Sequence, residues 1–212
     1  MRAPSFAGAL VVSMQLDIPP GDFAGYLFDL DGTLIDTMPV HFIAWQAALQ
    51  EAGLRGPLDE DYFYSMGGMP TPQVAELMGR RYGLRLDPQQ VSHAKELRYL
   101  EVLKKGVPLI EPVAAFARRI AATHPRAIVT GGTPDVAHPS LAVSGLAELF
   151  EFVITPHDVP AGRGKPAPDM FLLAARRIGV PPERCLVFED AEPGLAGARA
   201  AGMQVVHVPS RR

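Results

Sequence analysis

Four acidic side chains stand at the ends of two apolar segments, in a pattern suited to metal-assisted phosphoryl chemistry. Asp29 and Asp31 lie at the end of the apolar run in YLFDLDGT, and Glu189 and Asp190 end the stretch CLVFED. A turn explains one aspartate before Gly32, but it does not explain a second acid in a buried strand, where an unpaired charge is costly. Carboxylate oxygens are ligands that Mg²⁺ prefers. The acids therefore predict a site where a cation or a reacting group offsets their charge.

Two further segments supply groups that bind anionic oxygens. The stretch IVTGGT places the hydroxyl of Thr130 and the unhindered backbone of Gly131 after another apolar run, where N–H groups can face a phosphate. The stretch RGKPAPD adds Lys165 as a compact positive charge. Each fragment alone is weak evidence, because TGG turns and lysines before proline are common in loops. Their joint occurrence at successive strand ends predicts a metal-dependent phosphoryl site.

Short apolar runs alternate with amphipathic segments along the chain. The runs are rich in β-branched and aromatic residues, as buried parallel strands are, and they cover residues 26–30, 127–130, 152–155, 185–189 and 205–208. Helical spacing of apolar residues follows at 112–123, 169–179 and 193–202. This alternation predicts an α/β fold with a doubly wound, Rossmann-like parallel sheet. Ligands of such sheets bind beyond the carboxyl ends of the strands, where Asp29 is expected.

One interval breaks the alternation. Residues 39–106 contain helical patterns without a convincing strand, at 40–53, 71–83 and 88–106. We expect an all-helical cap domain inserted into the α/β core, with a hinge at the two crossings near residues 38 and 106. The expected division is a tail at 1–22, a core at 23–38 and 107–212, and a cap at 39–106.

The N-terminal residues resemble a signal peptide only faintly. Residues 6–14 are apolar and follow Arg2, but the run is short and no clear small-residue cleavage site follows it. A frayed tail is therefore expected. Whether translation starts at Met1 or at Met14 is left open.

The composition limits the partners and the compartment. The chain has 212 residues, of which 48% are hydrophobic, and a net charge of -3. No block of like charges suggests a nucleic acid or a membrane surface as a partner. Cys185 is the only cysteine, which excludes an internal disulfide and fits a cytoplasmic location. No apolar stripe stands apart from the core pattern, so a monomer is expected while the oligomeric state stays open.

The segments DLDGT, VTGGT, GKPAPD and FEDAEPG, in this order and with a helical insertion after the first, resemble the four motifs of the haloacid dehalogenase-like superfamily. Their spacing and the run from KPAPDMF to ARAAGM are most similar to its β-phosphoglucomutase-like branch. Within that branch, the resemblance is to the small sugar phosphatases that act on fructose 1-phosphate. It covers residues 23–208.

The resemblance implies a role for each matching residue. Asp29 would attack phosphorus and form an aspartyl-phosphate. Asp31 would protonate the leaving sugar oxygen and then deprotonate the attacking water. Mg²⁺ would be held by Asp29, the backbone carbonyl of Asp31 and Asp190, with Glu189 beside them. The residues that would bind the remaining phosphoryl oxygens are Thr130, Gly131 and Lys165.

Substrate contacts are expected from the cap. His41 begins the first cap helix just after the hinge, where its side chain can meet the substrate. Gly68 lies in the cap loop MGGMP, which should close over the site and exclude water. Thr71 follows this loop and completes the expected set. The implied function is a Mg²⁺-dependent phosphatase for small phosphorylated sugars.

A phosphosugar mutase that uses the same site is the main alternative. Mutases of the branch resemble one another in a cap loop where an arginine follows a Gly-x-Ser sequence and holds the second phosphate. Here the loop reads MGGMPTPQV, and the corresponding position falls near Thr71. Hydrolysis is therefore favoured, although Arg80, Arg81 or Arg98 could replace the missing charge.

Three other functions fit less well. A true dehalogenase needs neither Asp31 nor Asp190. A phosphonatase needs a cap lysine beside the scissile bond, and the cap lysines lie on or just after a helix whose charged face is expected to be solvated. These lysines are Lys95, Lys104 and Lys105. A binding module without activity would be expected to lose some of the costly clustered charges.

Overall fold

The computed structural model describes residues 15–67 and 69–209. It contains a five-stranded sheet whose strands are all parallel and run in the order β3-β2-β1-β4-β5. The strands are β1 (Gly25–Phe28), β2 (Arg126–Val129), β3 (Phe152–Ile154), β4 (Cys185–Glu189) and β5 (Gln204–His207). The bounds of each strand lie within two residues of those of a predicted apolar run. The central strand, β1, therefore has β2 on one side and β4 on the other.

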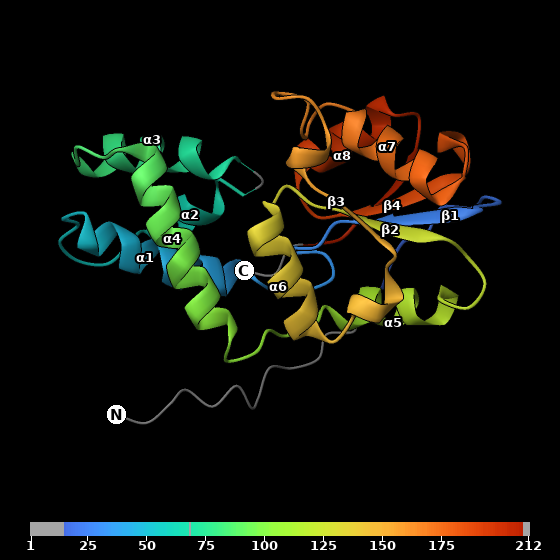
Figure 1. Ribbon diagram of the computed structural model, residues 1–212, viewed down its shortest axis with the longest axis horizontal. Coiled ribbons are helices and arrows are strands. Elements are labelled where there is room, and N and C mark those ends of the chain that lie inside the picture. The colour runs from blue at the N-terminus through green and yellow to red at the C-terminus, as the bar shows by residue number, and fades with distance from the viewer. Residues whose placement is uncertain (1–14, 68, 210–212) are drawn as a thin grey trace.

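Helices cover both faces of the sheet (Figure 1). On one face, α5 (Glu111–Ile120) and α6 (Pro134–Ser144) share a core with Phe28 and Phe188. On the other face, α7 (Asp169–Ile178) and α8 (Glu192–Ala200) share a core with Leu27 and Val187. Adjacent strand residues point to opposite faces, so the apolar run of β1 serves both cores. The predicted doubly wound α/β class is confirmed.

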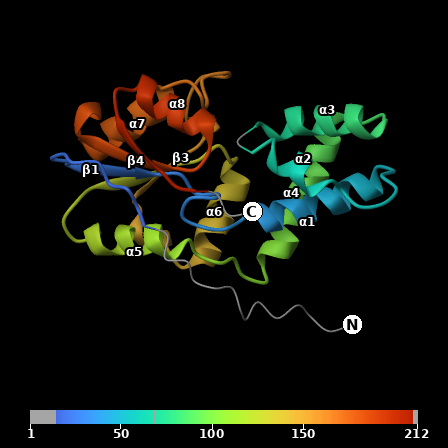
Figure 2. The same cartoon turned by 180° about the vertical axis from the view of Figure 1, so that it is seen from behind.

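The regular secondary structure in the described residues of the insertion after β1 is all helical. It holds α1 (Met38–Glu51), α2 (Glu60–Tyr64), α3 (Thr71–Tyr82) and α4 (Pro88–Leu103), which lie to one side of the sheet in both views (Figures 1 and 2). Their shared core includes Trp45 and Met78. The all-helical cap is thus confirmed, and its exact limits at 39–106 stay a prediction.

The two chain crossings between cap and core lie side by side. Ile35 and Leu109 form an antiparallel bridge, the N–H of Ile110 donates to the Leu34 carbonyl at 3.0 Å, and the N–H of Asp36 donates to the Pro108 carbonyl at 2.9 Å. The chain therefore enters and leaves the cap through one short, hydrogen-bonded pair of segments, and the hinge near residues 38 and 106 stays a prediction.

Two helices were not predicted from the sequence. Helix α2 has five residues, too few for the three-to-four apolar spacing to repeat. Helix α6 contains Pro139 in its interior, and an internal proline argues against a helix because it removes a backbone donor. Packing against α4 and the sheet offsets that cost here.

No helix among residues 15–67 and 69–209 combines the length and apolar character that a membrane crossing requires. The expected cytoplasmic location and monomeric state stay predictions. Met1 and Met14, between which the translation start was left open, lie outside the described residues.

Phe28 links the sheet to its helices and offers a test of this core. Its ring stacks on Phe188 with centroids 4.9 Å apart and meets Phe150 edge-on at 5.7 Å. Phe28→Ala leaves a cavity, so we expect the free energy of unfolding to fall by about 3–5 kcal/mol in urea titrations. Leu172→Ala, at a 42% exposed position, should change it by about 0.5 kcal/mol or less. A Phe28→Ala loss as small as the control's would contradict this packing.

Candidate active site

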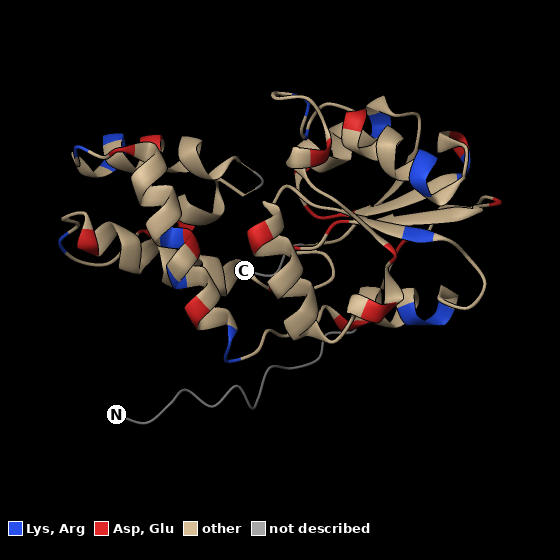
Figure 3. Cartoon of the chain, viewed as in Figure 1, with Lys and Arg blue, Asp and Glu red and all other residues tan. Residues whose placement is uncertain are grey.

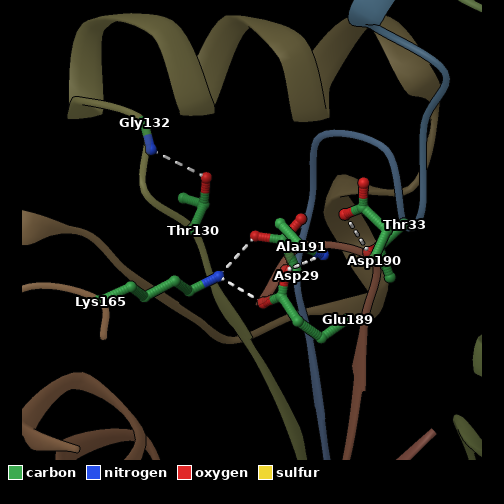
Figure 4. Close-up of polar contacts among 8 residues, drawn as sticks. All are labelled: Asp29, Thr33, Thr130, Gly132, Lys165, Glu189, Asp190 and Ala191. Carbon is green, nitrogen blue, oxygen red and sulfur yellow. Dashed lines mark hydrogen bonds and ion pairs between the residues drawn. The ribbon is translucent and has the colours of Figure 1, made fainter. Parts of the chain in front are cut away.

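A buried lysine joins the ends of β1 and β4. The Nζ atom of Lys165 lies 2.7 Å from Oδ1 of Asp29 and 2.7 Å from Oε2 of Glu189 (Figure 4). The side chains of Asp29 and Lys165 are less than a tenth exposed, and that of Glu189 is almost completely buried. Acidic segments gather at the sheet edge that faces the cap in Figure 3. The structure therefore brings together three of the residues predicted from the sequence.

The strand register explains why these acids meet. Phe28 is aligned with Phe188, and the N–H of Asp29 donates to the Phe188 carbonyl at 2.9 Å. The residues that follow the two phenylalanines, Asp29 and Glu189, therefore lie at the same level across the two strands. The carboxylate of Glu189 also accepts the N–H of Ala191 at 3.2 Å. A Cβ atom at Gly194 would overlap this carboxylate, so glycine makes the space that Glu189 occupies.

Asp190 is held by a residue that received no role from the sequence. The hydroxyl of Thr33 donates to Oδ1 of Asp190 at 3.0 Å (Figure 4). Gly32 precedes it with φ of 87°, and a Cβ atom there would overlap the Asp190 carboxylate. The turn after β1 thus needs a glycine both for its backbone angle and for the approach of Asp190. Thr33 belongs to the stretch DLDGT, so this motif was the sequence signal that could have revealed its role.

Asp29, Glu189 and Asp190 offer oxygens that all lie within 4.8 Å of one another. Burial and the charge of Glu189 raise the pKa of Asp29 well above its ordinary range, and the same causes raise the pKa of Asp190 to about 7. Burial lowers the pKa of Lys165, but the charges of Asp29 and Glu189 outweigh it and raise that pKa overall. Three crowded hard-oxygen ligands with one ammonium among them fit a divalent cation such as Mg²⁺.

The carboxylate of Asp31 points to the cap side instead. Its Oδ1 accepts the Thr37 hydroxyl at 2.6 Å and lies 3.7 Å from Nε2 of His41. Burial raises the pKa of Asp31, and this effect is outweighed by His41, Thr37 and the charge of Lys95, so the pKa lies below its ordinary value. Burial and the charge of Lys95 lower the pKa of His41. The structure thus places His41 beside the predicted acid.

Lys95 corrects an expectation. It lies in α4, where a solvated position was expected, but the residue is 4% exposed. Its Nζ is 5.4 Å from the ring centroid of Tyr99 and 6.0 Å from that of Trp45. Burial lowers its pKa to about 8. The solvation argument against a phosphonatase was therefore wrong, and the sequence alone did not reveal this buried cation near Asp31.

The remaining predicted positions are Thr130 and Gly131 in the core and Thr71 and Gly68 in the cap. Thr130 is buried at the end of β2, where its Oγ1 accepts the N–H of Gly132 at 3.0 Å, while Gly131 beside it is exposed (Figure 4). Thr71 begins α3, and no hydrogen bond or ion pair between described residues joins it to the strand-end acids. Gly68 lies outside the described residues. The roles assigned to all these positions stay predictions.

The arginines considered for a mutase are paired elsewhere. Each makes an ion pair with a carboxylate of the cap itself, and each side chain is at least two-fifths exposed. The pairs are Arg80–Glu76, Arg81–Asp59 and Arg98–Glu51. None of these contacts directs a charge toward the strand-end acids.

The comparisons with known proteins identify the family. The model for haloacid dehalogenase-like hydrolases matches residues 23–202. Fructose-1-phosphate phosphatase YqaB of Escherichia coli (strain K12) is 38% identical over 189 residues, or 88% of this chain and 96% of that protein. The chain therefore belongs to the haloacid dehalogenase-like hydrolases, as the four motifs predicted.

Two further matches extend the comparison. Beta-phosphoglucomutase of Bacillus subtilis (strain 168) is 27% identical over 187 residues, covering 86% of this chain and 81% of that protein. The crystal structure of CbbY from Rhodobacter sphaeroides in complex with phosphate superposes with a TM-score of 0.78. That match covers 89% of this chain and 87% of the other at 24% identity, and it shows a shared fold.

The raised pKa of Asp190 predicts how stability depends on pH. Without divalent cations, the folded protein holds a proton on Asp190 up to about pH 7, whereas the unfolded chain releases it near pH 4. The folded state thus binds more protons in this window, so Asp190 lowers the stability progressively as the pH rises and has no further effect above about pH 7.

Asp190→Asn tests this by urea unfolding in EDTA at several pH values. The variant keeps an acceptor for Thr33 but carries no titrating carboxyl. Relative to the parent, its free energy of unfolding should increase by about 1 kcal/mol per pH unit between about pH 5 and 7. Excess Mg²⁺ should suppress this trend in the parent, because a cation favours the ionised carboxylate. A difference that does not change with pH would refute the assignment.

Proposed function

We propose that the protein is a phosphomonoesterase that hydrolyses small sugar phosphates with Mg²⁺, through an aspartyl-phosphate on Asp29. The main support is the contact of Lys165 with both Asp29 and Glu189 within a cluster of three carboxylates. This arrangement would provide a nucleophile, a fixed positive charge and ligands for a cation at the carboxyl ends of neighbouring strands. The similarity to the phosphatase YqaB supports a sugar phosphate as the substrate.

The residues present would hold the cation through Asp29, Asp190 and the backbone carbonyl of Asp31, with Glu189 beside them. When bound, Mg²⁺ would offset the charge of the carboxylates and of the phosphoryl group. Lys165 would bind a phosphoryl oxygen, together with the Thr130 hydroxyl and the Gly131 N–H. Charge stabilisation and positioning supply most of the catalysis in such a transfer.

In the first half-reaction, a carboxylate oxygen of Asp29 attacks phosphorus while the bond to the sugar oxygen breaks. Asp31 donates a proton to that departing oxygen. Because the pKa of Asp31 is low in the free protein, the carboxyl must gain this proton when the substrate binds. The negative phosphate close by favours that uptake.

In the second half-reaction, Asp31 is a carboxylate again and acts as a base. It takes a proton from a water molecule, whose oxygen attacks the phosphorus of the aspartyl-phosphate. The bond between phosphorus and Asp29 breaks, inorganic phosphate leaves, and the carboxylate of Asp29 is restored. The proton that Asp31 takes from water replaces the one given to the sugar oxygen, so the cycle balances.

The mutase alternative stays open because a mutase is among the relatives. A mutase must hold a second phosphate on the cap side, and the arginines suggested for this are paired within the cap and exposed. Lys95 is a buried cation of the cap, so a mutase would have to use Lys95 to hold the second phosphate. The paired arginines favour water as the acceptor. The names of the relatives favour a phosphate ester over a phosphonate.

A panel of sugar phosphates tests the function directly. We expect phosphate release from fructose 1-phosphate or a related ketose or hexitol phosphate in the presence of Mg²⁺, and none in EDTA. β-Glucose 1-phosphate is assayed in parallel for conversion to glucose 6-phosphate. Conversion without phosphate release would establish the mutase, and release that persists in EDTA would overturn the metal requirement.

Two variants test the assigned roles. Asp29→Asn removes the nucleophile, so kcat should fall by roughly 10⁴-fold or more. Lys165→Ala removes a fixed charge from the transition state, so kcat should fall by about 10²- to 10³-fold. Lys105→Ala, an exposed lysine after α4, is the matched control and should leave kcat unchanged. Substantial turnover by Asp29→Asn, or a rise in KM alone for Lys165→Ala, would contradict these roles.

A further inference from the structure

A buried hydrogen bond joins the cap to the core beside the hinge. The hydroxyl of Tyr99 in α4 lies 2.8 Å from Oγ of Ser140 in α6, and both residues are fully buried. Ser140 donates its single proton to the Val136 carbonyl at 2.7 Å, so Tyr99 must be the donor in this pair. Burial raises the pKa of Tyr99 above its ordinary value. The hydroxyl therefore remains a neutral donor.

The surroundings of this bond are apolar. Val40 and Ala44 of α1, Leu103 of α4 and Val136 of α6 form one buried cluster with Tyr99. Apolar contacts hold helices together without fixing an orientation, whereas a hydrogen bond is directional. The bond to Ser140 thus sets how the Tyr99 ring sits between the cap and the core.

The same ring contacts the cap groups that face Asp31. The imidazole of His41 stacks on Tyr99 with centroids 4.3 Å apart and planes inclined by 17°, and it reaches to 3.7 Å from Asp31. The Nζ of Lys95 lies 5.4 Å from the ring centroid. One aromatic side chain therefore contacts both His41, which lies 3.7 Å from Asp31, and the buried ammonium of Lys95.

The hydroxyl of Tyr99 connects the ring to the core helix that follows the predicted phosphate-binding turn. Ser140 lies in α6, and this helix begins at Pro134, directly after the Thr130–Gly132 turn that follows β2. The bond between Tyr99 and Ser140 consequently relates the cap groups around Asp31 to the core helix that follows the predicted phosphate-binding turn.

We propose that Tyr99 is a positioning residue, whose hydrogen bond to Ser140 orients His41 and Lys95 against Asp31 for proton transfer to the leaving sugar oxygen. Tyr99 touches neither Asp31 nor the strand-end acids in the described contacts, so it acts through its neighbours. The inference rests on the proposed phosphatase function and deepens it. It predicts that loss of this bond impairs the proton transfer while attack by Asp29 continues.

Leaving groups with different needs for a proton separate this role from a general structural one. A sugar alkoxide leaves slowly without a proton, whereas p-nitrophenolate leaves readily without one. We expect Tyr99→Phe and Ser140→Ala each to lower kcat for the best sugar phosphate of the panel by roughly tenfold, with KM changed less than about twofold. The rapid first release of p-nitrophenolate from p-nitrophenyl phosphate should stay within about twofold of the parent.

The double variant and a control complete the experiment. Both single changes break the same bond, so the double variant should lose little more than either one. Tyr62→Phe removes a tyrosine hydroxyl that donates to the Leu77 carbonyl within the cap at 3.4 Å, and it should leave both rates unchanged. Melting temperatures of all variants are measured alongside, and Ser140→Ala remains informative if Tyr99→Phe folds poorly.

The outcomes distinguish the two levels of the proposal. A parent protein that releases no phosphate from any sugar phosphate would reject the phosphatase function and this inference with it. An active parent with unchanged Tyr99→Phe and Ser140→Ala kinetics would reject the positioning role alone. Equal losses on the sugar phosphate and on the p-nitrophenolate burst, or strictly additive losses in the double variant, would also reject it.

Discussion

The structure depends on one buried ammonium, that of Lys165, placed between the carboxylates of Asp29 and Glu189. Two carboxylates in an apolar sheet lose their hydration and repel each other, so neither could stay ionised there without a compensating cation. The order of the strands makes the contact possible, because β1 and β4 are neighbours in register. Gly194 leaves the room that Glu189 needs. The balance of charge among Lys165, Asp29 and Glu189 therefore depends on the order and register of the strands.

Under the proposed function, the groups that handle charge are separated from those that handle protons. The core provides the acids, Lys165 and the Thr130 turn, all at the carboxyl edge of the sheet. The cap provides His41, which lies 3.7 Å from Asp31, and Lys95, whose charge lowers the pKa of Asp31. Asp31 is the residue at which the two parts meet. If these roles hold, a change in the cap can alter proton transfer and substrate choice while the proposed phosphoryl-binding residues of the core stay intact.

Much of this could be predicted from the sequence, because parallel strands end at a common edge and the acids follow apolar runs. The burial of Lys95 could not, since the polar sequence of α4 does not show which face packs against Trp45 and Tyr99. Helix α6 was missed because Pro139 opposes a helix locally while tertiary packing stabilises it. The contact of Thr33 with Asp190 joins residues far apart in the chain, so no local pattern announces it.

The antiparallel bridge between Ile35 and Leu109 places the entry and exit of the cap next to each other. The core chain is therefore nearly continuous in space across an interruption of dozens of residues. A shorter, longer or unrelated cap with closely spaced ends could be joined at this point without rerouting any strand of the sheet. This geometry makes the cap a replaceable module, and it allows one catalytic core to acquire new substrates by exchange of a whole domain.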